Sequence, residues 1–200
     1  MRISWAAALL AGTFAASVAA QSKAPATSLE RPFAAGGRIT MDLSAGEYEI
    51  TGAADSRIRL DWDVEDRDRL DEVDNRVTVK GTEARVATDG PTGNFRVRIQ
   101  VPVQSNLHIR LTAGEMAIKG IEGDKDVELH AGELDIDVIR AEDYGHVDAG
   151  VWAGEIHASP FRITKEGLFR SFDWSGKGKY RLHAHLKAGE LRLHGDSGAR

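Results

Sequence analysis

Leu111 to Val138 reads LTAGEMAIKGIEGDKDVELHAGELDIDV, and this stretch decides the fold. Apolar and polar residues alternate on both sides of each Ala-Gly-Glu triplet, which is the period of half-buried β-strands. From Ala113 to Ala131 the step is 18 residues, and a further 18 residues lead to the near copy Ala149-Gly150-Val151. A fixed period of this length indicates stacked repeats. The five full triplets begin at Ala45, Ala113, Ala131, Ala153 and Ala188.

The repeat predicts an all-β fold, a β-solenoid resembling a single-stranded β-helix, with coils of about 18 residues. Glycine supplies the positive backbone angle of each corner, and the glutamate faces solvent because an unpaired buried carboxylate is very costly. We expect a flexible N-terminal segment at 21–37, the solenoid domain at 38–195 and a C-terminal tail at 196–200. One short surface helix is expected within 65–75, where Leu70 and Val73 lie three residues apart among charges.

The stretch Leu111–Val138, together with RIQVPVQSNL from Arg98 to Leu107, resembles the bacterial exported β-solenoid family named "putative adhesin", a domain of unknown function. The closing segment WSGKGKYRLHAHLKAGELRLHG, which starts at Trp174, is similar to the end of such domains. The resemblance implies a β-solenoid and an adhesive or structural role. It implies no catalytic residues, because the shared motifs are structural repeats.

Residues 1–20 have the form of a secretory signal peptide, with Arg2, an Ala-rich apolar run and small residues before Gln21. We therefore expect an exported protein, periplasmic or extracellular, without a membrane span after cleavage. The net charge of −5, with both signs interspersed, argues against a nucleic-acid partner. The chain has no cysteine, which excludes disulfides and thiol-based metal sites.

The stacked corners predict a row of like charges. Glu115, Glu133 and Glu155 would lie on successive coils. One hypothesis is that this row binds a ladder of divalent cations. The simpler hypothesis is that nearby lysines neutralise the carboxylates. The candidate partners are Lys119, Lys125 and Lys187.

Other motifs give weak signals for chemistry. His183 and His185 share one face of a strand, but a zinc site needs a third ligand, and only a distant one such as His130, His157 or His194 could serve. The acidic run at 65–75 lacks the glycine and terminal glutamate of a calcium loop. The SGKGK sequence from Ser175 departs from the phosphate-loop spacing and indicates a turn. Asp135 and Asp137 could suggest glycoside hydrolysis, although such pairs arise by chance in a chain that is 28% charged.

Phe161 to Trp174 reads FRITKEGLFRSFDW and interrupts the repeat with four aromatic residues. One hypothesis is an irregular insertion that caps the open end of the core. The other is a protruding element that binds a partner. The interaction candidates are Phe169, Phe172 and Trp174.

Together these patterns predict a non-enzymatic envelope or secreted protein without a cofactor, which binds an unknown envelope protein or glycan. Two alternatives stay open. One is a polysaccharide-acting β-helix enzyme, which would need clustered carboxylates in a groove. The other is a periplasmic accessory protein of envelope stress or signalling.

Overall fold

The computed structural model describes residues 27–91 and 93–195, and it is all-β. The expected signal peptide and C-terminal tail lie outside the described residues. In the part described, no helix is both long and apolar enough to cross a membrane. Within residues 27–91 and 93–195 there are three short 3-10 helices, η1 (Arg67–Glu72), η2 (Ala141–Asp143) and η3 (Ser159–Phe161). The strands are β1 (Ser28–Pro32), β2 (Arg38–Leu43), β3 (Gly46–Ala53), β4 (Arg57–Val64), β5 (Asp74–Lys80), β6 (Glu83–Asp89), β7 (Phe95–Pro102), β8 (Asn106–Lys119), β9 (Lys125–Val138), β10 (Tyr144–Ala158), β11 (Ile163–Ser175) and β12 (Tyr180–Gly195).

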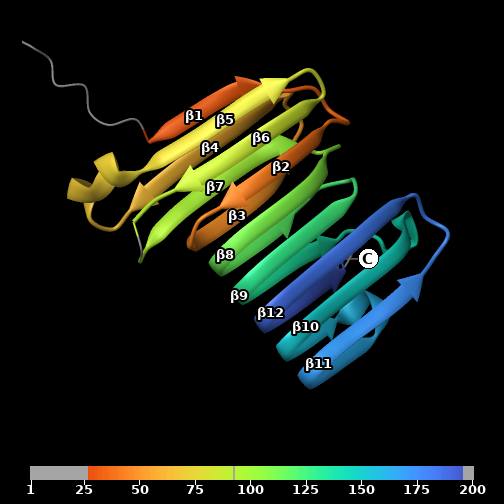
Figure 1. Cartoon of the computed structure of the whole chain (residues 1–200). Coiled ribbons are helices and arrows are strands. Elements are labelled where there is room, and N and C mark those ends of the chain that lie inside the picture. Colours follow the sequence, from red (N-terminus) through yellow and green to blue (C-terminus); the bar gives the residue numbers. More distant parts are fainter. Residues whose placement is uncertain (1–26, 92, 196–200) are drawn as a thin grey trace, which may run out of the picture.

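The strands form one mixed, open sheet of 12 strands (Figure 1). Its centre is the parallel set β8-β9-β12-β10, and β11 closes one end as an antiparallel edge strand. At the other end the long strands are replaced by pairs of shorter ones. β2 pairs with the first half of β8, and β3 pairs with its second half.

Each long strand bends at its Ala-Gly-Glu triplet and contributes to two layers around one core. In β8 the buried side chains are Leu107, Ile109 and Leu111 before the bend, and Met116 and Ile118 after it. Because the alternation restarts at the bend, both halves direct their apolar residues inward. The predicted inward rows are therefore confirmed, and they belong to a single hydrophobic cluster.

The order of the strands differs from a simple stack of successive repeats. β12, the last strand, lies between β9 and β10 and pairs with both in parallel. The 18-residue step holds from β8 to β9, where Leu107 pairs with Lys125. It fails at the next strand, because Ala149 pairs with Ala184 and the true corner of β10 is Gly154. The near copy was thus wrongly read as a corner.

Three further expectations need correction. Part of the segment predicted to be flexible, 21–37, forms β1, and Phe33 after it is buried. The predicted helix within 65–75 is shorter, a 3-10 helix that passes into β5 at Asp74. The segment expected to be an irregular insertion is mostly the regular strand β11, which pairs along almost the whole of β10.

Candidate functional site

A column of glycines aligns the bends of the long strands. Gly114, Gly132, Gly189 and Gly154 lie in register on adjacent strands, each with a φ between 125° and 144°. A Cβ on Gly132, Gly189 or Gly154 would lie 1.8 Å from the carbonyl oxygen of the neighbouring glycine. Only glycine fits such an approach, so the triplets are placed by backbone packing, as the repeat predicted.

The four glutamates after these glycines extend, with Glu47 and Glu166, into a row across six strands. Glu47, Glu115, Glu133, Glu190, Glu155 and Glu166 lie in register on β3, β8, β9, β12, β10 and β11. All of them are partly or fully exposed, as predicted. Of the three candidates, Glu115 and Glu133 are neighbours, whereas Glu190 separates Glu133 from Glu155.

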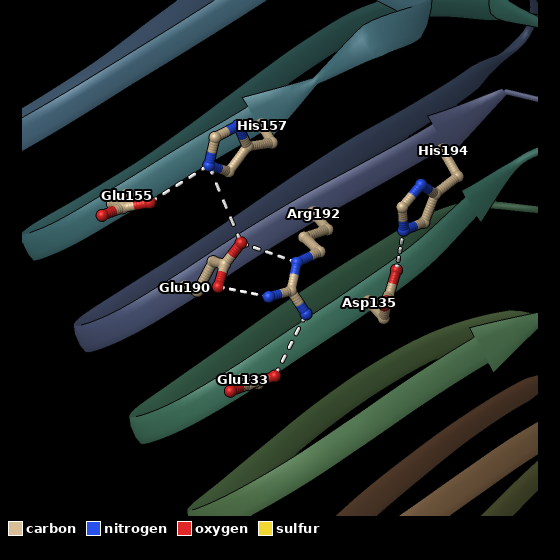
Figure 2. A network of polar contacts seen from close by, with 7 residues as sticks. All are labelled: Glu133, Asp135, Glu155, His157, Glu190, Arg192 and His194. Carbon is tan, nitrogen blue, oxygen red and sulfur yellow. Dashed lines mark hydrogen bonds and ion pairs between the residues drawn. The ribbon is translucent and has the colours of Figure 1, made fainter.

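An arginine and a histidine already contact part of this row (Figure 2). Arg192 donates to Glu190 through Nε at 2.6 Å and to Glu133 through Nη1 at 3.1 Å. His157 Nε2 lies 3.1 Å from Glu155 and 3.7 Å from Glu190. The Arg192 contacts neutralise carboxylate charge that a metal ion would otherwise meet, and the His157 contacts occupy carboxylate oxygens. They make a divalent-cation ladder along the row less favourable than the sequence suggested.

The lysines expected as partners have other roles. Lys119 pairs with Glu49 at 2.9 Å, and this hydrogen bond raises the pKa of Lys119 and lowers the pKa of Glu49. Lys187 is exposed in the half of β12 that precedes the glycine bend. Neither lysine pairs with a residue of the predicted row in the described residues.

Lys125 was wrongly placed at the surface. It is 1% exposed, at the register position of Leu107 and Leu182. Its ammonium donates to the carbonyl of Ile121 at 2.8 Å and to the Tyr144 hydroxyl at 2.7 Å. Burial lowers its pKa to about 8, because the charged form loses its hydration.

Beside the glutamate row the surface is hollowed. The cavity is about 440 Å³ and is lined by both signs of charge, including Glu49, Arg96, Lys119 and Asp135. The small side chain of Ala117 also lines it. Asp135, one of the two predicted acidic residues, pairs here with His194 (Figure 2).

The aromatic candidates separate into two groups. Phe172 is 6% exposed, and Trp174 packs beside Phe161 with ring centroids 4.9 Å apart, so both cover the end of the core. Phe169, in contrast, is 71% exposed. Its φ of 54° is rare for a bulky residue.

Phe169 lies in an exposed hydrophobic ridge that the sequence did not reveal. The ridge consists of Trp152, Leu168 and Phe169, which are 58%, 63% and 71% exposed. The Trp152 and Phe169 rings are 5.8 Å apart, across the pairing of β10 with β11. These three are the exposed large hydrophobic side chains of the described residues. Charged and polar groups, including Lys165, Glu166 and Arg170, line a shallow hollow that contains Phe169.

His183 and His185 face outward on β12, as the alternation predicted. The residue that meets them is Asp148 of β10, which pairs with His183 in the register. Two of the other ligands that the sequence suggested, His157 and His194, lie beyond the glycine bend. Asp148 could not be identified from sequence because β12 is inserted beside β10.

One comparison with solved structures supports the fold. No family model matches the chain, and no curated protein matches it. A crystal structure of a "putative cell adhesion protein" from Clostridium sporogenes is similar, with a TM-score of 0.54 and 13% identity over 84% of this chain and 99% of that one. A "putative adhesin" from Parabacteroides merdae is matched at a TM-score of 0.28 and 12% identity, over 84% and 91% of the chains. The first similarity shows a common fold.

Proposed function

We propose that this chain is a non-enzymatic, exported binding module that contacts a protein of the cell envelope through the ridge Trp152–Leu168–Phe169. The observation that carries this proposal is the gathering of the exposed large hydrophobic side chains at the β10–β11 end of the sheet. Exposed apolar clusters with a polar rim are typical of protein interaction sites. The fold shared with the "putative cell adhesion protein" supports an adhesin-like role.

The backbone at the ridge also supports a binding role. Phe169 keeps a left-handed conformation that costs roughly 1–2 kcal/mol for a residue other than glycine. Such strain is typical of functional positions, where it sets the direction of a side chain. Here it accompanies a ring that contacts Trp152 and remains 71% exposed.

The ridge favours side-chain contacts over the addition of a partner strand. β11 is an edge strand, but Gly167 and Phe169 both have positive φ and interrupt its regular geometry. Lys165 Nζ and Arg170 Nε donate to the carbonyl groups of Ser171 and Glu166. Irregular geometry and charge of this kind protect an edge from pairing with another strand.

We also propose that the four bent strands are coils of a β-solenoid in which β12 is out of sequence order. The aligned glycine column and the parallel register of equivalent residues support this description. The exported location rests on the form of residues 1–20.

The binding role can be tested by site-specific photocrosslinking. A photoreactive residue replaces Phe169 or, as a matched control at the other end of the sheet, exposed Arg85. We expect one envelope protein to be crosslinked from position 169 and not from 85. With that protein purified, Phe169→Ser and Trp152→Ser should weaken the affinity by more than about tenfold, since aromatic anchors dominate interfaces.

Equal crosslinking from both positions, or unchanged affinity of both variants, would refute the proposal. Binding of a purified glycan that Phe169→Ser abolishes, without any protein adduct, would replace the protein partner by a carbohydrate.

A further inference from the structure

Two histidines and one carboxylate come together on the outer surface of the sheet, in the halves of β12 and β10 that precede the glycine bends. His183 and His185 lie at alternate positions of β12 and therefore face the same side. Asp148 on β10 is the register partner of His183, and Gly150 is the register partner of His185. The cluster lies within the central parallel strands, where the backbone is fixed by pairing on both sides of β12.

The three ligand atoms are close enough to share one ion. His183 Nδ1 lies 2.9 Å from Asp148 Oδ2, and His185 Nε2 lies 3.2 Å from the same oxygen. All three side chains offer ligand atoms within 4.8 Å of one another. Ligands at about 2.1 Å from a tetrahedral zinc ion are separated by roughly 3.4 Å. The two separations from Asp148 Oδ2 differ from this value by about 0.5 Å or less, and a rotation of the stacked imidazoles would bring both ring nitrogens to one ion.

Gly150 provides the space for this arrangement. A Cβ at position 150 would lie 2.9 Å from Cε1 and 3.0 Å from Nδ1 of His185. The imidazole of His185 therefore lies against bare backbone and stacks on His183, with centroids 4.2 Å apart and an angle of 20°. This contact explains the near copy Ala149-Gly150-Val151, whose glycine is not at a bend.

One ring nitrogen of the cluster is not satisfied by the protein. His185 Nε2 is buried from solvent, and its approach to Asp148 does not have the geometry of a hydrogen bond. Unpaired buried polar atoms are rare and costly. A metal ion held between this nitrogen, His183 and Asp148 would satisfy it.

Neighbouring carboxylates favour a cation at this cluster, and the partial exposure of its side chains gives the cation access from solvent. Asp126 on β9 and Asp173 on β11 are the register partners of His183 and Asp148, so carboxylates flank the cluster on both sides. The side chains of Asp148, His183 and His185 are 31%, 44% and 40% exposed. An open, three-ligand zinc site takes water as its fourth ligand.

We propose that Asp148, His183 and His185 bind a divalent transition-metal ion, with zinc as the natural occupant. Two imidazoles and one carboxylate suit zinc and its first-row neighbours, whereas calcium and magnesium prefer oxygen ligands alone. The other three-ligand group, Glu155, His157 and Glu190, is a poorer site because the guanidinium of Arg192 is bonded to Glu190 (Figure 2).

The test is titration of zinc chloride into the full chain, purified without a polyhistidine tag, by calorimetry at pH 7.5. We expect saturable binding of one zinc ion per chain and a higher melting temperature with zinc. His183→Ala, His185→Ala and Asp148→Asn should each weaken binding by more than about tenfold. The matched control His157→Ala, in the other group, should leave the affinity unchanged.

Gly150→Ala gives a second, independent variant. It retains every ligand but pushes the His185 ring away, so its zinc affinity should fall. Absence of saturable zinc binding at pH 7.5 would overturn the proposal. Zinc binding that persists in the double variant His183→Ala/His185→Ala would also overturn it. Equally tight binding of calcium by the unsubstituted chain would do the same.

Discussion

Gly132 approaches Gly114 so closely that a Cβ on Gly132 would lie 1.8 Å from the Gly114 carbonyl oxygen. Gly132→Ala must therefore displace backbone at the bend as well as adopt a φ of 135°. We expect a loss of unfolding free energy of about 3 kcal/mol or more, measured by urea denaturation. Gly81→Ala is the control, because Gly81 has a φ of 60° and open space around it. If the two variants lost equal stability, the positive φ alone would account for the glycines in the column, and the close approach of neighbouring backbone would not be needed.

Lys125 makes stability depend on pH. The pKa of Lys125 is about 8 in the folded chain, below its value in the unfolded chain. Between about pH 8 and 10 Lys125 is therefore largely neutral in the folded chain and largely protonated in the unfolded chain. The free energy of unfolding should therefore rise with pH through this window, by about 2 kcal/mol from pH 7 to pH 10. Lys125→Met should lose this rise, as measured by urea denaturation at each pH.

The neighbouring Tyr144 titrates in the opposite sense. Burial raises its pKa above the usual value, so its contribution lowers stability above about pH 10. The comparison of wild type with Lys125→Met should therefore stop at pH 10. A rise of the same size in both proteins would contradict the assignment to Lys125.

Phe172 and Phe169 should respond oppositely to substitution. Phe172→Ala removes a ring that is 6% exposed and packs beside Phe161, so we expect a loss of about 3 kcal/mol or more. Phe169→Gly removes an exposed ring and relieves a φ of 54°, so stability should rise by up to about 1 kcal/mol. Thermal and urea denaturation of both variants measure this contrast. A destabilised Phe169→Gly would assign Phe169 to the cap of the core.

Arg192 links Glu190 on its own strand to Glu133 on β9. Arg192→Met should cost about 0.5–1 kcal/mol at low salt, and the cost should shrink at 1 M sodium chloride because the side chain is 35% exposed. Arg98→Met is the matched control, since Arg98 is 77% exposed and lies 3.8 Å from Glu49. Its substitution should change stability by a negligible amount. A loss for Arg192→Met that did not depend on salt would show that its packing matters more than its charge.

The elements of the fold could largely be predicted from local patterns. Alternation placed Leu107, Ile109 and Leu111 inward, and the recurring triplet placed the glycine bends. Strand order could not be obtained in this way, because the 35 residues from Ala153 to Ala188 fit two repeats as well as a return past β11. The register of β12 between β9 and β10 is set by long-range packing.

The candidate sites depended on that unpredicted order. Asp148 meets His183 only because β12 lies beside β10, and Trp152 meets Phe169 only because β11 folds back as a hairpin. Lys125 at an inward position could have been noticed from alternation, since it precedes Asp126 and Val127 with the parity of the core. Lysine is rarely buried in proteins, so the inward position of Lys125 was not expected.

The position of β12 has a consequence for how the chain reaches its final form. Without β12, β9 and β10 would each lack a pairing partner on one side, and the space between them would fit a single strand. We expect assembly to end with the insertion of β12, so that a donor strand supplied by another molecule could compete for the same position. A chain shortened before Tyr180 should accept a synthetic peptide of residues 180–195, so that two fragments complete one sheet.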